Sequence, residues 1–254
     1  AETINALRGQ GWNGERIQHG ADRSYDVYVD AGLYESWSAI PYLVPASAVD
    51  LLPVHDVVPL NQGVAFIVWP YDTNRRWEED VFPYLPRPAY IRVERGPAGQ
   101  GDLDPEPYTL AMITRAEPIP EVPEPVARFE NGILLRAALV QKVSDDGIQV
   151  NLWWEPTSLI QHPYTVFAHY NRDGVKIAQH DGQPGLGHLP TPTWVPGDLI
   201  LDVHPLPGIV PNPEVDTLRI GLYNAETGEG VTPLSPEGEP DADAIEVPVI
   251  IAEP

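Results

Sequence analysis

Cysteine is absent from this 254-residue chain, and methionine occurs once. The absence of cysteine excludes disulfides, thiolate metal sites and cysteine nucleophiles together. Basic residues are scarce as well: 15 lysines and arginines stand against 37 aspartates and glutamates, for a formal net charge of −22. Such a surface repels phosphate backbones and anionic lipid headgroups, so we expect neither nucleic-acid binding nor peripheral membrane binding.

Long apolar runs are also missing. The richest one, residues 64–69, has the length of a strand and falls far short of the ~20 residues that cross a bilayer. No signal peptide is recognisable either. Because the chain begins at Ala1 without an initiator methionine, we expect a processed or trimmed segment, with any membrane anchor lying outside it.

Proline, in contrast, is abundant, with 30 residues beside 21 glycines. Proline at this frequency disfavours long helices and favours turns, edge strands and stiff connectors. The densest run holds Pro118, Pro120, Pro123 and Pro125. It predicts an extended linker over residues 118–125, and therefore two domains, 1–117 and 126–254.

Strand-like and helix-like patterns alternate before the linker. The predicted strands are residues 26–31, 48–52, 63–69, 89–94 and 108–114, and the predicted helices are 2–9, 33–43 and 75–85. The last two strands are expected to form an antiparallel pair. Alternation of this kind predicts a small three-layer α/β domain of Rossmann-like type.

After the linker the pattern changes to short alternating strands separated by turn residues. The predicted strands are residues 132–141, 147–155, 164–171, 175–180, 199–204, 217–223 and 244–251. Their number and spacing predict an antiparallel β-sandwich of immunoglobulin-like or jelly-roll type. The fold class expected for the whole chain is thus a two-domain α+β protein.

Motifs that carry chemistry are missing from both parts. No G-x-G-x-x-G, no G-x-x-x-x-G-K-[ST] and no G-x-S-x-G occurs, so we expect no cofactor and assign no catalytic residue. His169, His180 and His204 fall on three predicted strands and would converge only if those strands were neighbours. No histidine pair has H-x-x-x-H spacing, and we expect no metal site.

One candidate ligand site lies at the carboxyl ends of two predicted strands in the first domain. The first strand ends at Asp30, and Tyr34 follows shortly after it. The buried strand ends at Trp69, and Tyr71 and Asp72 follow it. If the two strands are adjacent, these residues line one crevice that would suit a sugar or a cationic ligand. The competing interpretation is that Trp69 and Tyr71 close the edge of the core while Asp72 caps the next helix.

A second candidate is Trp153. Strand alternation over residues 148–155 places Ile148, Val150, Leu152 and Trp154 on one face and Gln149, Asn151, Trp153 and Glu155 on the other. A tryptophan on a polar face beside amide side chains is typical of carbohydrate-binding sandwiches. Alternatively, a loop or the first domain covers Trp153.

The second domain resembles a known family over three stretches. Residues 164–184 (YTVFAHYNRDGVKIAQHDGQP), 192–197 (PTWVPG) and 218–228 (LRIGLYNAETG) resemble the β-sandwich at the C-terminal end of bacterial family 39-type glycosyltransferases. These are membrane proteins related to protein mannosyltransferases and lipid A aminoarabinose transferases. The α/β region before the linker is similar, through looser cues, to the extracytoplasmic domain that precedes the sandwich in that family.

This resemblance implies a role outside the membrane. The family's catalytic acidic residues lie among transmembrane helices that this chain lacks, so none is carried over. Trp194, Gly197, Gly221 and Tyr223 become packing and turn positions. The expected function is a non-catalytic, membrane-tethered extracytoplasmic domain, whose partners are a glycan or lipid-linked sugar and the transmembrane part of the same protein. The alternative is a free-standing secreted carbohydrate-binding or adhesion module.

Overall fold

The computed structural model describes residues 25–36, 38–44, 49–52, 63–68, 84–85, 87–95, 109–115, 124–144, 147–241 and 243–252. The chain divides into two compact units, Ala1–Arg115 and Ala116–Pro254. The predicted helix over 2–9, nearly all of the predicted helix over 75–85 and most of the predicted linker lie outside the described residues.

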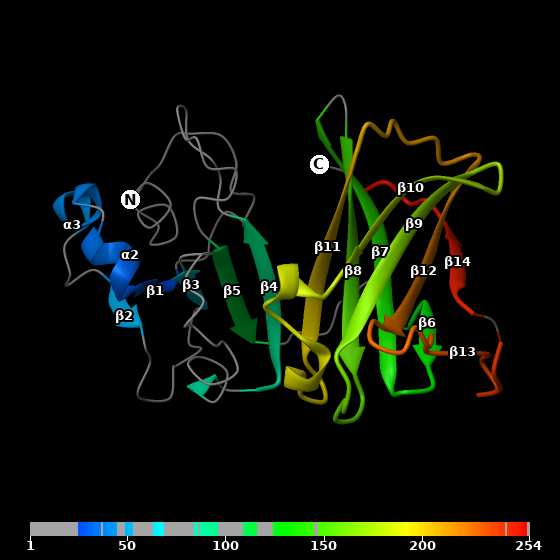
Figure 1. Cartoon of the computed structure of the whole chain (residues 1–254), viewed down its shortest axis with the longest axis horizontal. Helices are drawn as coiled ribbons and strands as arrows, with labels where there is room; N and C mark the ends of the chain where they lie inside the picture. Colours follow the sequence, from blue (N-terminus) through cyan, green and yellow to red (C-terminus); the bar gives the residue numbers. More distant parts are fainter. Residues whose placement is uncertain are drawn as a thin grey trace. The chain divides into compact units, whose positions relative to one another are not determined.

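The first unit contains a mixed β-sheet (Figure 1). Its strands are β1 (Asp26–Asp30), β2 (Asp50–Leu52), β3 (Val64–Val68), β4 (Ala89–Arg95) and β5 (Thr109–Arg115). They lie in the order β4-β5-β3-β1-β2; β1 pairs in parallel with β2 and β3, whereas β5 pairs antiparallel with β3 and β4. The predicted antiparallel pair is confirmed. A mixed sheet of this kind does not support the Rossmann-like prediction.

Two short helices, α2 (Ala31–Ser36) and α3 (Ala39–Leu43), stand where one helix was predicted over 33–43. The first begins directly after β1 because Asp30 caps it: its Oδ1 accepts the backbone N–H of Leu33 at 3.0 Å. Leu33 packs with buried residues of β1 and β3 in the core of this unit. In the part of the chain that the structure describes, no helix has the length and apolarity needed to span a membrane.

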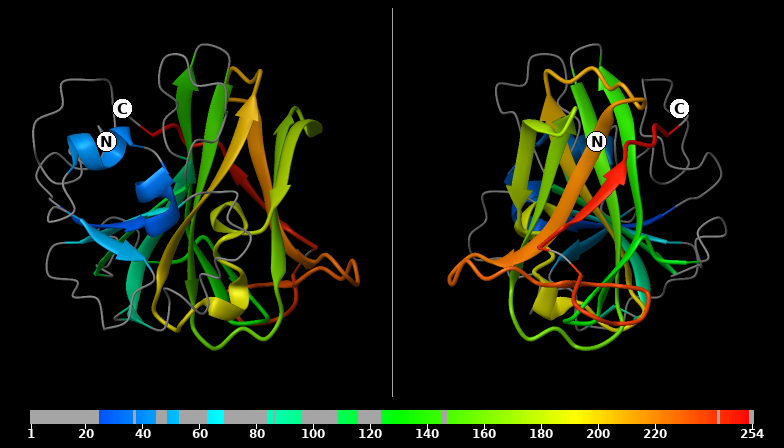
Figure 2. Two further views of the ribbon diagram at one scale, coloured as in Figure 1. Left: turned by 60° about the vertical axis from the view of Figure 1, so that its left-hand side comes forward. Right: turned by 90° about the vertical axis from the view of Figure 1, so that its right-hand side faces the viewer.

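The second unit is built from two antiparallel sheets, as the views in Figures 1 and 2 show. One sheet runs β13-β6-β7-β8-β11 and the other β10-β9-β12-β14. The bounds are β6 (Ala127–Phe129), β7 (Ile133–Ser144), β8 (Gly147–Pro156), β9 (Tyr164–Arg172), β10 (Val175–Gly182), β11 (Leu199–Pro207), β12 (Asp216–Asn224), β13 (Pro233–Leu234) and β14 (Ile245–Pro248). All seven predicted strands are confirmed. The protein is therefore rich in β-structure arranged in several sheets.

Turn chemistry fixes how these strands follow one another. Asp173 and Gly174 have φ values of +50° and +76° and join β9 to β10 as a two-residue hairpin turn. Both angles lie in the left-handed region that Asp and Gly tolerate best. Gly197, with φ of +86°, precedes β11 and confirms the predicted turn there.

The core of the second unit follows strand alternation. On β8 the apolar side chains of Ile148, Val150, Leu152 and Trp154 are all buried, as the sequence predicts. On the other sheet the buried positions are Val166, Ala168 and Tyr170 of β9 and Leu218, Ile220 and Leu222 of β12. Trp194 is 1% exposed, and its Nε1 donates to the carbonyl oxygen of Leu189 at 2.9 Å. Its predicted core position is confirmed.

Replacing this ring tests the packing directly. We expect Trp194→Ala to lower the free energy of unfolding by about 3–5 kcal/mol, because the substitution leaves a large cavity and an unpaired Leu189 carbonyl. Urea denaturation followed by circular dichroism measures the change. Leu159→Ala is the control, since Leu159 is 65% exposed and its truncation should change little. Similar midpoints for the two variants would contradict the packing described here.

Candidate functional site

The outer face of the four-stranded sheet gathers aromatic, charged and imidazole side chains. We call Phe167 and His169 of β9, Asp181 of β10, and Arg219 and Tyr223 of β12 the outer cluster. Strand register brings them together: Phe167 is opposite Asp181, and His169 is opposite Arg219. Their neighbours in sequence point into the core, so these five project away from it. Figure 2 shows β9, β10 and β12 side by side.

The rings of the outer cluster contact one another. The Phe167 ring centroid lies 4.8 Å from that of His169 and 6.3 Å from that of Tyr223. The guanidinium carbon of Arg219 stands 5.6 Å from the Phe167 centroid, within the range of a cation–π contact. Asp181 reaches both flanking groups: its carboxylate accepts from the Tyr223 hydroxyl at 3.5 Å and lies 3.8 Å from His169 Nε2.

Gly221 lets the central ring lie close to the sheet. A Cβ atom at this position would come within 2.5 Å of Phe167 Cζ, nearer than non-bonded carbons approach. Any side chain at 221 would therefore push the ring away from its present position. This contact explains the packing role that the family resemblance gives to Gly221.

The pKa shifts of two titratable groups of the outer cluster favour their neutral forms. Burial, with the positive charges of Lys176 and Arg219, lowers the pKa of His169 below its ordinary value of 6.5, against the opposing charge of Asp181. Burial and the Asp181 carboxylate raise the pKa of the Tyr223 hydroxyl. A neutral imidazole has one donor and one acceptor, and a phenol has both functions. The face thus pairs aromatic surface with groups that can bind hydroxyls.

Sequence reasoning named His169 and Tyr223 but did not place them in one site, and it did not single out Phe167 or Arg219. Alternation within β9 and β12 does place Phe167 with His169 and Arg219 with Tyr223 on common faces. What the sequence lacks is the pairing of the two strands, which brings the sets together across the sheet. The family resemblance pointed to Tyr223, but as a packing residue.

The predicted crevice of the first unit is only partly described. Its premise is confirmed, because β1 and β3 are parallel neighbours. Asp30 is 1% exposed and caps α2, while Tyr34 is buried and donates its hydroxyl to the Val44 carbonyl at 2.7 Å. Asp30 and Tyr34 thus have capping and packing roles, and a ligand role for them stays a prediction. The other three residues, Trp69, Tyr71 and Asp72, lie outside the described residues.

Trp153 lies on the face of β8 that the sequence predicts. It is half-buried, and its partners across the sheet are Ala137 and Leu201. On the same face Gln149 donates to the Asn151 side chain at 2.7 Å. Trp153 therefore has apolar partners on the adjacent strands and polar neighbours along β8, and a ligand role for it stays a prediction.

The three strand histidines separate into two groups. His180 and His204 meet, with their Nδ1 atoms 2.9 Å apart, whereas His169 belongs to the outer cluster on the opposite face of the sheet. Within the residues that the structure describes, no group of three or more histidine, aspartate or glutamate side chains is placed to hold a metal ion.

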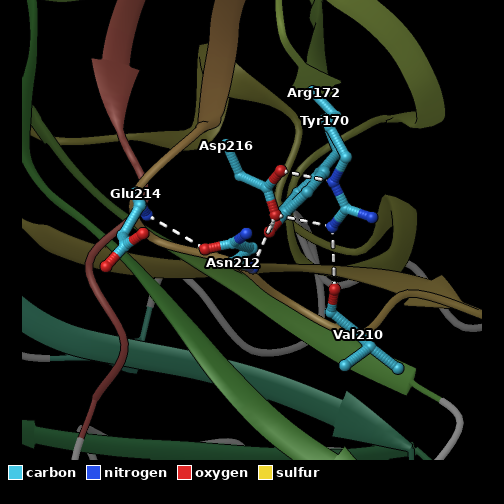
Figure 3. Close-up of polar contacts among 6 residues, drawn as sticks. All are labelled: Tyr170, Arg172, Val210, Asn212, Glu214 and Asp216. Carbon is cyan, nitrogen blue, oxygen red and sulfur yellow. Dashed lines mark hydrogen bonds and ion pairs between the residues drawn. The ribbon is translucent and has the colours of Figure 1, made fainter.

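A buried polar network stabilises the end of the same sheet (Figure 3). Asp216 has a fully buried side chain, and its carboxylate accepts two hydrogen bonds from Arg172, at 2.7 and 2.8 Å. It also accepts the Tyr170 hydroxyl and the backbone N–H of Asn212, each at 2.6 Å. These bonds, those of Arg172 above all, lower the pKa of Asp216 to about 2. With every carboxylate oxygen engaged, the network serves the fold.

Comparisons with known proteins add little. No protein-family model matches the chain, and no curated protein matches it. Among solved structures, a calcium-binding mutant of Bacteroides uniformis beta-glucuronidase 2 aligns with a TM-score of 0.26 and 10% sequence identity. The alignment covers 50% of this chain and 14% of that one, so this chain spans a small part of its length. A similarity of this degree carries no argument about function.

The low pKa of Asp216 makes stability depend on acid in a defined window. Since the folded-state pKa is about 2 and the ordinary value is 3.8, the carboxylate stabilises the fold above pH ~4, and this contribution disappears as the pH falls toward 2. The loss amounts to on the order of 2 kcal/mol. Asp216→Asn should therefore be less stable at pH 7 and should lose less stability between pH 4 and 2.

Urea denaturation at pH 7, 4 and 2.5 measures both effects. Asp173→Asn is the matched control, because Asp173 is an exposed carboxylate in the neighbouring turn and Asn tolerates its positive φ. An Asp216→Asn variant whose stability falls with acid as steeply as that of the control would contradict the assignment.

Proposed function

We propose that this chain is a non-catalytic, glycan-binding ectodomain of a membrane glycosyltransferase-like protein, and that the outer cluster holds the glycan or lipid-linked sugar. The observation that carries the proposal is the gathering of the half-buried Phe167, Tyr223 and His169 on one face of the four-stranded sheet, with Asp181 and Arg219 beside the rings. We assign no catalytic residue to the chain and no cofactor.

The chemistry of the outer cluster favours a sugar over other ligands. A pyranose ring offers an apolar face of C–H groups and a rim of hydroxyls. Aromatic rings provide a rigid apolar surface with little conformational entropy to lose. Asp181 accepts hydrogen bonds, Arg219 donates them, and His169 and Tyr223 do both, so hydroxyls of either orientation find partners.

The resemblance to family 39-type glycosyltransferases supports the placement outside the membrane. Its three stretches coincide with β9 and β10, with the short helical turn η4 (Thr191–Thr193) and the turn after it, and with β12. The outer cluster is drawn from the first and the last of these stretches. In this proposal the transmembrane part of the same protein performs catalysis, and the ectodomain, tethered on the extracytoplasmic side, binds the acceptor or product glycan.

We favour an immunoglobulin-like sandwich over a jelly-roll for the second unit, because the chain passes between the sheets in a characteristic order. β7, β8 and β11 lie in one sheet, and β9, β12 and β14 in the other. This matches strands A, B and E against C, F and G of immunoglobulin-like domains. For the first unit, the β1–α2–α3–β2 crossover supports an α/β domain, although not a Rossmann-like one.

The alternative is a free-standing secreted carbohydrate-binding or adhesion module. It is favoured by the fact that every residue of the outer cluster belongs to one unit of the chain. Such a module would bind the same class of ligand through the same face. The two proposals differ in what the full-length gene product contains.

Glycan binding by the whole chain is the direct test. A glycan array should identify a ligand, and titration calorimetry with it should give an affinity that Phe167→Ala lowers at least about tenfold, or ~1.4 kcal/mol. Asp181→Asn should weaken binding without loss of fold, because Asp181 is at the exposed rim. Trp153→Ala tests whether the ligand binds instead to the face of β8 that carries Trp153. Binding lost in Trp153→Ala but kept in Phe167→Ala would move the site to β8, and no binding to any glycan would overturn the proposal.

Hydropathy of the full-length gene product distinguishes the two alternatives. An ectodomain of a membrane transferase requires several ~20-residue apolar spans in the same polypeptide, with paired acidic residues in an external loop among them. A secreted module requires only a cleavable signal peptide. Finding no such spans would rule out the transferase proposal while leaving the glycan-binding face to be tested by itself.

A further inference from the structure

A histidine pair connects the two sheets of the second unit. His180 belongs to β10, an edge strand of the four-stranded sheet, and His204 to β11 of the other sheet. Their Nδ1 atoms lie 2.9 Å apart, with ring centroids 5.0 Å apart and ring planes at 76°. His204 is 1% exposed, whereas His180 is half-buried. Two ring nitrogens of opposed strands thus point at one position inside the unit.

A buried carboxylate fixes the proton on the inner ring. Asp202 Oδ2 lies 2.9 Å from His204 Nε2. Its other oxygen, Oδ1, accepts the backbone N–H groups of Gly185 and Val203, each at 3.1 Å. An ionised carboxylate only accepts hydrogen bonds, so His204 carries its proton on Nε2. In the neutral ring, Nδ1 therefore presents a lone pair toward His180.

We propose that His180 and His204 bind a divalent transition-metal ion, such as zinc, through their Nδ1 atoms, with Asp202 orienting His204 from behind. Neutral imidazole is a preferred ligand of zinc, copper and nickel. Metal-binding histidines characteristically donate their other ring N–H to a carboxylate, the arrangement that Asp202 and His204 already have. This site is independent of the outer cluster and of the proposed glycan binding.

Binding of the ion requires a small displacement of the pair. Two nitrogen ligands of one tetrahedral zinc, each ~2.05 Å from the metal, are about 3.4 Å apart. The pair must therefore open by roughly 0.5 Å from its present separation. The half-buried His180 ring can make this adjustment, because Gly182 beside it has no side chain; a Cβ there would lie 3.3 Å from His180 Cε1. The described residues bring no third acidic or imidazole ligand to the pair, so water or a small anion completes the coordination.

Zinc titration of the whole chain tests the site. The net charge of −22 will attract cations to surface carboxylates, so the informative quantity is the difference between matched variants. By calorimetry in 0.15 M salt, the unmodified chain should bind one equivalent of zinc that His180→Ala does not bind. His162→Ala is the control: its histidine is exposed, lies outside the pair and should leave the stoichiometry unchanged. Zinc should raise the unfolding temperature of the unmodified chain and of His162→Ala, and should leave that of His180→Ala unchanged.

Asp202→Asn separates a metal site from a simple hydrogen-bonded pair. Two backbone N–H groups face Oδ1, so the amide oxygen must occupy that position and the NH2 group must face His204 Nε2. This reversal forces the His204 proton onto Nδ1 and blocks the lone pair needed for the metal. Zinc affinity should fall 10–100-fold or more while the circular dichroism spectrum stays native.

Three results would overturn the proposal. They are the absence of a zinc equivalent in the unmodified chain, equal binding by the His180→Ala variant, and full affinity in folded Asp202→Asn. A copper titration gives an independent readout, since nitrogen hyperfine structure in its electron paramagnetic resonance spectrum should indicate two imidazoles in the chain and at most one in His180→Ala.

Discussion

The hydrogen bonds that pair the buried carboxylate of Asp216 are the interaction on which the second unit most depends. A charge removed from water costs several kcal/mol unless it is fully paired, and Asp216 meets this requirement only when β9 and β12 lie in one register. Tyr170 and Arg172 approach it from β9, and Asn212 from the loop before β12. A slip by one residue would leave the carboxylate unpaired and turn every side chain of β12 to the other face. The same register places Phe167 and His169 beside Arg219 and Tyr223, so the outer cluster depends on a residue that it does not contact.

Other buried aspartates act in the same way on the loops next to β11. Asp198 accepts the Val195 N–H at 2.6 Å and closes the turn that leads into the strand. Asp202 accepts the Gly185 N–H and thereby holds the loop that contains η3 (Gly185–Gly187). Each carboxylate satisfies backbone donors that would otherwise be unpaired in the interior. Some of the acidic residues of this chain therefore stabilise the geometry of its loops.

The sequence predicted strands better than it predicted their neighbours. Alternation and turn residues located β8 to within one residue, from 147–155 to Gly147–Pro156, because a buried face repeats every second position. β6 and β13 were missed because three and two residues are too few to establish a period. Pairing is not local information, so neither the outer cluster nor the meeting of His180 with His204 could be read from one strand. The predicted crevice shows the same limit: the sequence left the adjacency of β1 and β3 as a condition, which the structure meets, and it did not indicate that Asp30 caps α2.

The alternation of side chains along β9 and β10 explains why one sheet carries the outer cluster on one face and the histidine pair on the other. His169 is opposite Gln179 and faces outward, whereas the next pair, Ala168 with His180, faces the core. Adjacent residues of β10 are divided in the same way: Asp181 contacts His169 and Tyr223 on the open side, while His180 meets His204 on the inner side. Because the sheet backbone lies between them, a ligand on the outer cluster and an ion at the histidine pair would not share a single side chain. Substitutions on either face can thus change one property without removing the contacts that support the other.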